Sequence, residues 1–511
     1  MNRLKHPLFF STFLLTLSGI LSRIMGFFYR IFLSRSIGSE GLGVYQMMFP
    51  IYGICFSLCT GSIQTAISRY VASNLKQAKQ ILLSGLLLAS SLSLILATLV
   101  WDQADFIADH LLMESRCAPL LPILALSIPF SALHGCICGY FYGKENVRIP
   151  AVSQLVEQLV RIFTVWLIIR LWREQNRTVN AMTAVFGLLA GEIASSLFVL
   201  FSFLVRIREN DSSVPEPETS FSVKPTTKYR SLQTITRSLT IMAVPMMANR
   251  LTLNLLQSLE AVFIPNQLEV FGLTPAQALS LYGVLTGMAM PFILFPSAIV
   301  NSLAVILLPT IARQQASRNA SGIQKNLNIS IRCSLSIGIL CIGIFTMFGH
   351  DLGMLVFENQ DAGTYITILA WLCPFLYLAT TIGSVLNGLG KTSTTFANTC
   401  VSLLIRLVFV FFGIPRFGIH AYLWGLLVSE ILLVLLHGLS LNRFVGFSPD
   451  TWDVLVKPSF CLMAALGVHK LLPDNMILFP ALPAFIWTLV QIGFVSVCYV
   501  LLLLLMQRKT N

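Results

Sequence analysis

Apolar runs of about 20 residues recur from one end of the chain to the other, separated by short polar connections. A helix of this length spans roughly 30 Å of hydrocarbon. We therefore predict an all-α membrane protein with fourteen transmembrane helices. They lie near residues 8–34, 42–72, 81–101, 116–142, 150–172, 180–206, 236–264, 278–312, 328–348, 362–388, 394–414, 418–440, 453–472 and 480–506.

The first of these runs carries charge that an apolar helix should not tolerate. Arg23 and Arg30 are seven residues apart, so they project from nearly the same face of a helix with 3.6 residues per turn. Gly19, Ser22 and Gly26 extend that small polar face, and large apolar residues cover the rest. Such a helix can present its apolar side to lipid and two positive charges to a hydrated or protein interior.

Composition excludes most soluble classes of protein. Hydrophobic residues make up 55% of the chain and charged residues 11%, and the mean hydropathy is +0.77. The net charge of +12 comes mainly from short connections, which fits orientation in a membrane better than nucleic-acid binding. The eleven cysteines lie almost entirely inside apolar runs, so we interpret them as packing residues rather than as a redox or zinc site.

The charges in the connections alternate along the chain and predict one topology. Basic connections lie near 3–5, 76–79, 144–148, after 206, and near 313–325, 391, 443 and 508–509. Acidic connections lie near 102–114, 269 and 351–361, and the basic connection at 170–177 is an exception on that side. By the positive-inside rule, we expect both termini of this multi-pass membrane protein to be cytoplasmic.

An internal repeat predicts two lobes. Residues 123–130 resemble 368–375, Arg161 matches Arg406, and residues 187–193 with Glu192 match 425–431 with Glu430. Each copy of the repeat contains six spans. Because six is an even number, both copies enter the membrane in the same direction and are related by an axis along the membrane normal. We predict an N-lobe at 1–206, a cytoplasmic linker rich in Pro, Ser and acidic residues at 207–235, a C-lobe at 236–445, and accessory spans with a tail at 446–511.

No constellation of enzymatic residues stands out. The turn at 388–392 looks like the end of a phosphate loop, but Val385 occupies the position of a required glycine. We therefore expect no enzyme activity, no catalytic residue, no metal and no bound cofactor. The driving force would come from the substrate's own gradient or from coupling to membrane potential, H⁺ or Na⁺.

Four arginines inside apolar runs are candidates for lining a substrate-binding cavity. An arginine at the centre of a membrane helix costs about 2.5–3.5 kcal/mol, so such residues suggest a function. The four are Arg23, Arg30, Arg69 and Arg250. Arg69 lies near the cytoplasmic end of its span and could instead snorkel to the surface, as Arg30 could on the outer side.

The carboxylates in the spans have structural and coupling interpretations. Glu157 precedes Arg161 by four residues, the favourable orientation for a structural ion pair on one helix. Glu192 and Glu430 occupy matched repeat positions, which suggests that each bonds a neighbouring helix, with a proton or sodium site as the alternative. Glu260 could lie at a gate or partner an arginine.

Prolines and glycines within the spans predict bends. A proline removes one helical hydrogen bond, and a membrane tolerates the break where protein or a cavity satisfies the backbone. The positions are Pro50 and Gly53, Pro129, Pro245, Pro291, Pro296 and Pro374. Helices bent around a central space are what alternating access requires.

The N-terminal segments resemble a known family. Ser-Arg-Ile-Met-Gly-Phe-Phe-Tyr-Arg at 22–30 begins a pattern that continues through Gly-Leu-Gly-Val-Tyr-Gln-Met at 41–47, Pro-Ile-Tyr at 50–52 and Ala-Ile-Ser-Arg at 66–69. This pattern is similar to that of the stage V sporulation protein B group. The group lies within the polysaccharide branch of the multidrug/oligosaccharidyl-lipid/polysaccharide exporter superfamily. Residues 281–287 and 309–312 extend the likeness.

The resemblance implies a flippase in a bacterial plasma membrane. Its substrates would be undecaprenyl-pyrophosphate-linked oligosaccharides of the cell wall, spore cortex or surface polysaccharide. Two six-helix lobes would rock about a central cavity, and the cavity arginines match this chain at Arg23 and less closely at Arg30. Guanidinium groups bind phosphate oxygens in a bidentate fork, which agrees with this assignment. The expected partners are the lipid-linked oligosaccharide, the bilayer and envelope biosynthesis enzymes, with no nucleic acid and a monomeric state.

Three alternatives remain open from sequence. A drug/cation antiporter of the same superfamily should have carboxylates where Arg23 and Arg30 stand. A membrane glycosyltransferase would need a catalytic constellation and a larger extracytoplasmic loop. A non-transporting scaffold for envelope enzymes is the third.

Overall fold

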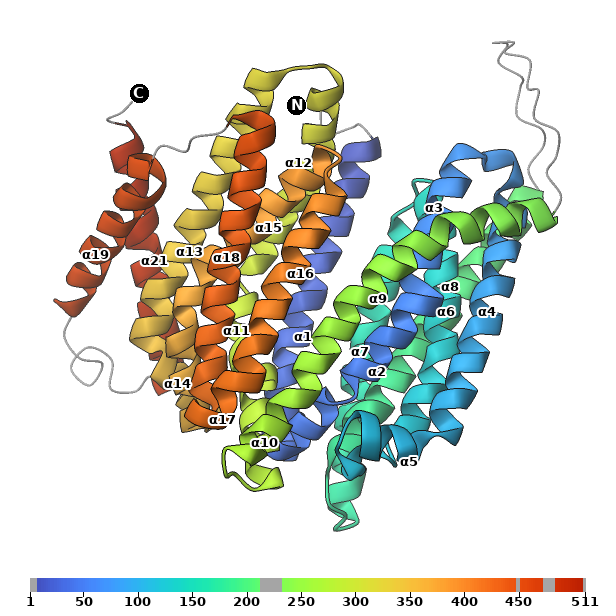
Figure 1. The fold of residues 1–511 in the computed structure, drawn as a ribbon, viewed down its shortest axis with the longest axis horizontal. Coiled ribbons are helices and arrows are strands. Elements are labelled where there is room, and N and C mark those ends of the chain that lie inside the picture. Colours follow the sequence, from blue (N-terminus) through green and yellow to red (C-terminus); the bar gives the residue numbers. More distant parts are fainter. Residues whose placement is uncertain (1–6, 212–231, 447–450, 472–482, 509–511) are drawn as a thin grey trace. The chain divides into compact units, whose positions relative to one another are not determined.

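The computed structural model describes residues 7–211, 232–446, 451–471 and 483–508 (Figure 1). Every secondary-structure element within these ranges is helical. Fourteen described segments are long and apolar enough to cross a membrane, which confirms the predicted all-α membrane class. Most of the predicted linker at 207–235 lies outside the described residues.

The number of membrane-length segments agrees with the prediction, but their division differs at two places. The predicted eighth span at 278–312 is two segments, Pro275–Leu294 and Ser297–Ala316. They are interrupted at Phe295 and Pro296, because Pro296 has no N–H with which to continue the helical hydrogen bonds. The predicted span at 453–472 does form helices, η9 (Trp452–Val456) and α19 (Lys457–Lys470), but charged residues lower its hydropathy and it is not among the fourteen.

Contacts between Cα atoms divide the chain into two compact units. The N-unit comprises Met1–Tyr29 and Val44–Ser258, and the C-unit comprises Arg30–Gly43 and Leu259–Asn511. The chain therefore passes from one unit to the other inside α1 (Pro7–Gln46) and inside α9 (Leu232–Val270). The lobe boundaries at 206, 236 and 446, and the cavity expected between the lobes, stay predictions.

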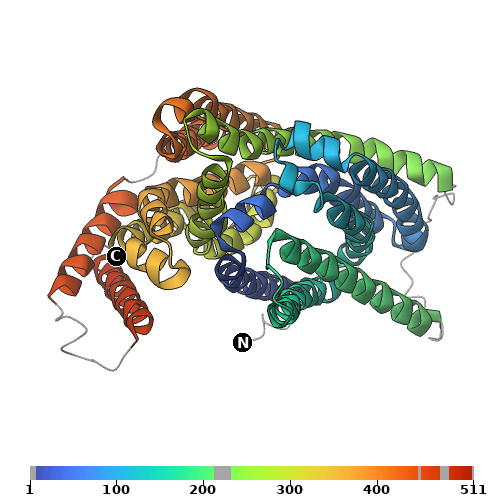
Figure 2. The ribbon, with the colours of Figure 1, turned by 90° about the horizontal axis from the view of Figure 1, so that it is seen from below.

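The N-unit is a helical bundle in which α7 packs on α8, and α6 packs on α3, α4 and α8 (Figures 1 and 2). Gly135, Gly139 and Gly143 recur every fourth residue on α6 and let η2 and α3 approach it closely. Besides α1 and α9, the elements of this unit are α2 (Phe49–Phe56), η2 (Ser57–Gly61), α3 (Ser62–Ser73), η3 (Leu75–Gln77), α4 (Ala78–Asp102), α5 (Ala104–Phe106), η4 (Ile107–Leu111), η5 (Ser115–Cys117), α6 (Leu121–Gly143), α7 (Arg148–Glu174) and α8 (Ala181–Asp211).

The C-unit packs α13 on α14 and α15, α12 on α15, and α16 on α18, while α19 and α21 pack on each other and on α13. Apolar residues such as Ile311, Leu327 and Val385 form a buried core between α12, α13 and α15. Its remaining elements are α10 (Pro275–Gly283), η6 (Val284–Ala289), α11 (Met290–Leu294), α12 (Ser297–Ala316), α13 (Ala320–Phe357), α14 (Gln360–Leu369), η7 (Ala370–Leu372), α15 (Cys373–Gly388), α16 (Thr392–Val408), η8 (Phe409–Gly413), α17 (Ile414–Phe417), α18 (Ile419–Val445) and α21 (Ala484–Arg508).

The second half of α1 is held inside the C-unit by polar and close backbone contacts. Arg35 donates from Nε to the carbonyl of Val356 at 2.7 Å and from Nη2 to that of Leu355 at 2.8 Å. These carbonyls end α13 and have no helical partner of their own. Gly38 has a φ of 74°, and Gly43 lies so close to the Leu279 carbonyl that a Cβ would overlap it. Residues Arg30–Gly43 of α1 are therefore part of the C-unit.

Side chains satisfy several of the carbonyls near the predicted breaks. Asn254 donates to the carbonyl of Gly53 at 3.0 Å, and Tyr377 donates to that of Ile293 at 2.7 Å. The Gly53 carbonyl also accepts from the backbone N–H of Ser57. An unsatisfied carbonyl in hydrocarbon would cost several kcal/mol, so the Tyr377 bond helps to make the interruption after Leu294 tolerable in a membrane.

All eleven cysteines are free thiols, and eight of them are buried. Cys117 lies before the helix that begins at Leu121, and burial raises the pKa of its thiol to about 12, with Glu114 acting in the same direction. In the described parts of the chain, no group of three or more His, Cys, Asp or Glu residues is placed to hold a metal ion. The cysteines occupy packing positions.

Candidate functional site

Arg23 lines a polar pocket of about 430 Å³ in the N-unit. Gly19, Ser22 and Arg23 come from one face of α1, Tyr142 from the end of α6, and Gln154 and Glu157 from α7. The small residues predicted to lie beside Arg23 leave this space open. The arginine face of the first span therefore lines a pocket in a protein of membrane-length helices.

The polar groups of this pocket are available for a ligand. Ser22, Arg23, Tyr142 and Gln154 make no side-chain hydrogen bond or ion pair with any other residue that the structure describes. Arg23 is exposed, and the other three are partly buried. An arginine with no protein partner can direct all five of its N–H groups to an anion.

Glu157 connects the pocket to a buried group of charges in the N-unit. Arg161, one turn further along α7, donates from Nη2 to Oε1 of Glu157 at 2.5 Å, which confirms the predicted structural pair. Glu192 on α8 is buried and accepts a hydrogen bond from Tyr52 of α2 at 2.7 Å. Glu192 also acts electrostatically on the Arg161 guanidinium. The cluster joins α2, α7 and α8.

The C-unit contains a second group of the same composition. Arg406 on α16 donates from Nη2 to Glu430 of α18 at 3.0 Å and from Nη1 to Glu260 of α9 at 3.4 Å. Its Nε donates to the hydroxyl of Ser429 at 3.2 Å, and Tyr422 donates to Glu260. Oε2 of Glu430 is buried and has no hydrogen-bond partner among the described residues.

The two clusters occupy the positions that the internal repeat matched. Each has one partly buried arginine with two carboxylates and a tyrosine near it, and each joins three helices. Glu192 and Glu430 therefore bond neighbouring helices, which was the first of the two alternatives predicted for them. Glu260 partners an arginine, which was the second of its two predicted alternatives. A gating or ion-coupling role for these three residues stays a prediction.

Arg250 belongs to a polar stripe on α9 that faces α2, η2 and α3 within the N-unit. Arg250 donates from Nη2 to Thr65 at 3.4 Å, and Asn254 one turn later donates to Ser57 and to the Gly53 carbonyl. The Arg250 guanidinium lies over Gly61, where a Cβ would overlap Nη1. The missing side chain at Gly61 leaves room for this guanidinium.

We expect Gly61→Ala to displace the Arg250 guanidinium and to lower substrate translocation, by no more than Arg250→Ala does, because the displaced side chain keeps its charge. Because both changes act on one group, the double variant should be no worse than Arg250→Ala alone. The control is Gly53→Ala, whose Cβ would meet Asn254 at an ordinary 3.7 Å. Transport in liposomes by the four variants provides the measurement. Full activity of Arg250→Ala would contradict the substrate-binding role predicted for this residue.

The other two predicted arginines lie elsewhere. Arg30 belongs to the C-unit, where its Nη1 lies 3.5 Å from the carbonyl of Thr286 in η6. Arg69 is exposed near the end of α3 and has no side-chain partner in the described part of the chain, which is compatible with snorkelling. Arg23 and Arg30 thus fall in different units, although their spacing places them on nearly one helix face.

Sequence reasoning missed several residues of these sites. Tyr52 appeared only as part of the family pattern, and Tyr422 gave no signal, because an isolated tyrosine in an apolar run is common. Tyr142 and Gln154 enter the pocket only through the packing of α6 and α7 around α1. Arg406 was noted as a repeat match alone, and its position inside an apolar span between two buried carboxylates was the available clue.

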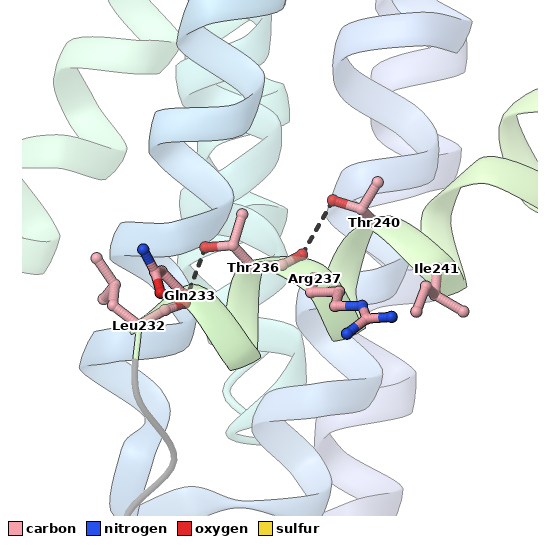
Figure 3. Close-up of a pocket in the computed structure, with 6 residues that line it drawn as sticks. All are labelled: Leu232, Gln233, Thr236, Arg237, Thr240 and Ile241. Atoms are coloured by element: carbon pink, nitrogen blue, oxygen red, sulfur yellow. Dashed lines mark hydrogen bonds between the residues drawn. The ribbon is translucent and has the colours of Figure 1, made fainter.

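A second hollow, of about 500 Å³, follows the start of α9 (Figure 3). Leu232, Gln233, Thr236, Arg237, Thr240 and Ile241 line it, all from one helix. Thr236 and Thr240 donate to carbonyls of their own helix, four residues earlier, at 3.0 and 2.9 Å. The face of a single helix does not enclose a ligand, so the Arg23 pocket is the better candidate site.

Fourteen described membrane-length segments, with charged residues kept among them, define a multi-pass helical membrane protein. The chain belongs to the polysaccharide biosynthesis protein family, whose model matches residues 9–315, more than half of its length. A second family model, MatE, matches residues 267–412. These matches confirm the resemblance to the exporter superfamily predicted from the N-terminal segments.

Individual relatives agree with this assignment. Stage V sporulation protein B of Bacillus subtilis is 27% identical over 450 residues, covering 86% of this chain and 84% of the relative. A solved structure of the lipid II flippase MurJ in an inward closed conformation has a TM-score of 0.73 at 15% identity and covers 98% of this chain and 99% of that one. An inward-facing multidrug resistance MATE family transporter has a TM-score of 0.62 at 13% identity, covering 85% and 99%. The structural likenesses establish the shared two-lobed fold, and the two solved structures are named as a flippase and a transporter.

Proposed function

We propose that this protein is a flippase that moves undecaprenyl-pyrophosphate-linked oligosaccharides across the bacterial plasma membrane by alternating access. The observation that carries the proposal is the unpartnered Arg23 in a polar pocket among membrane-length helices. A pyrophosphate bears about two negative charges, and a guanidinium binds phosphate oxygens bidentately while staying charged at any physiological pH. The sugar would lie in the hydrated pocket while the polyprenyl chain remains in lipid.

Membership of the polysaccharide biosynthesis family and likeness to a lipid II flippase support the same class of substrate. A drug/cation antiporter is the alternative, because MATE transporters share the fold. A cationic substrate would be repelled by Arg23, whose charge no described residue pairs. The arginine therefore favours the anionic lipid.

The test uses the purified full-length protein in liposomes that carry fluorescent undecaprenyl-pyrophosphate-linked N-acetylglucosamine. We expect the protein to speed the loss of fluorescence to a membrane-impermeant quencher, relative to protein-free liposomes. Measuring translocation under an imposed membrane potential, H⁺ gradient or Na⁺ gradient would then show whether translocation is coupled to any of them. Unchanged lipid translocation together with active movement of a cationic dye would replace the proposal with the antiporter.

A further inference from the structure

The Arg23 pocket holds more than an anion site needs. Beside the guanidinium lie a carboxylate, an amide and a phenol, from Glu157, Gln154 and Tyr142. A site that bound phosphate alone would gain nothing from a carboxylate, which repels anions. The pocket therefore fits a ligand with an anionic group and, close to it, neutral hydrogen-bond donors.

The ion pair with Arg161 makes Glu157 suitable for this task. The guanidinium of Arg161 occupies Oε1 and offsets the negative charge, and the side chain of Glu157 is 18% exposed. No described residue bonds Oε2, so this oxygen is left as a hydrogen-bond acceptor. A paired carboxylate can therefore accept a hydroxyl or amide hydrogen without strongly repelling a phosphate held at Arg23.

Gln154 and Tyr142 complete a surface suited to a polyol. Gln154 lies three residues before Glu157, so both project from one face of α7. The amide of Gln154 has two donors and an acceptor, and the hydroxyl of Tyr142 can donate or accept. Neither side chain bonds any residue in the described ranges, so both polar groups are open to a ligand.

We propose that Gln154, Glu157 and Tyr142 form a subsite for the first sugar, the one attached directly to the pyrophosphate that Arg23 binds. The inference rests on the proposed function, and it adds recognition of a neutral sugar with hydroxyl and amide N–H donors. The volume of about 430 Å³ is at the lower end of the range of ligand pockets, about 300–1,000 Å³. It suits the sugar beside the phosphate and leaves later sugars outside the pocket.

The experiment measures binding of two probes to the purified full-length protein, undecaprenyl pyrophosphate and undecaprenyl-pyrophosphate-linked N-acetylglucosamine. We expect Gln154→Ala and Tyr142→Phe each to weaken binding of the sugar-carrying probe by roughly five- to tenfold, the usual effect of losing one hydrogen bond. Binding of the sugar-free probe should not change, which also shows that the variants are folded. Gln103→Ala, at an exposed glutamine outside the membrane-length segments, is the matched control.

The outcomes separate the subsite from the proposed function. Equal weakening of both probes, or of neither, by Gln154→Ala and Tyr142→Phe would overturn the sugar subsite while leaving the flippase proposal in place. If the unaltered protein binds neither probe, the proposed function itself fails. A loss confined to the sugar-carrying probe supports the subsite.

Discussion

Arg23→Ala is expected to lower translocation of the lipid-linked sugar by at least about tenfold while the protein stays folded. Hydrogen bonds to charged groups contribute about 1.5–3 kcal/mol, which corresponds to roughly ten- to hundredfold in binding. The unfolding temperature should not change, because Arg23 bonds no other described residue and faces an open pocket. Translocation in liposomes and thermal unfolding in detergent measure the two effects.

Two further variants make this test specific. Arg23→Lys keeps the charge but loses the bidentate fork, so its activity should lie between those of the unaltered protein and Arg23→Ala. Arg173→Ala removes an exposed arginine at the end of α7, outside the pocket, and should leave translocation unchanged. Undiminished translocation by Arg23→Ala would end the argument for a phosphate-binding arginine. A large fall in its unfolding temperature would instead indicate a structural role.

Arg23 lies in the part of α1 that belongs to the N-unit, close to the point where α1 passes into the C-unit. Residues up to Tyr29 belong to the N-unit with the pocket, and residues Arg30–Gly43 belong to the C-unit, where Arg35 is bonded to the end of α13. A helix anchored in both units must bend or turn when they move. Alternating access would then change the surroundings of Arg23 directly, which is how a substrate that binds one state better shifts the equilibrium.

Local sequence signals were sufficient for the membrane class and most helix positions. Apolar runs of membrane length need no partner to be recognised, because the hydrocarbon itself selects them. The internal repeat paired Arg161 with Arg406 and Glu192 with Glu430. In the structure these residues form two clusters of similar composition. These signals depend on length, spacing and similarity within the chain.

What sequence could not supply depends on contacts between distant residues. Glu260 and Arg406 are 146 positions apart, and no periodicity indicates that they meet. The change of unit within α1 is equally invisible, since the apolar pattern runs across Tyr29 and Arg30 without a change. The break at Phe295 and Pro296 was signalled by two prolines, but a proline alone does not decide between a kink and an interruption.

Arg406→Leu is expected to destabilise the protein by about 3–5 kcal/mol, the usual cost of removing one partner from a buried ion pair. Glu260 and Glu430 would remain buried in the C-unit without a counter-charge, and Ser429 would lose a donor. Thermal unfolding in detergent measures the loss. Arg313→Leu, at an exposed arginine near the end of α12, is the matched control and should have little effect.

Substitution of the carboxylates in this cluster should distinguish a structural role, in which they hold helices together, from a role in ion coupling. Glu430→Gln should cost only about 1 kcal/mol, because Arg406 keeps Glu260 and the amide oxygen can still accept its hydrogen bond. Adding Glu260→Gln and Glu430→Gln to Arg406→Leu removes the unpaired charges and should recover part of the lost stability. If Glu430→Gln unfolds at the same temperature as the unaltered protein but no longer responds to an imposed H⁺ or Na⁺ gradient, the carboxylate couples transport rather than bracing α16 against α18.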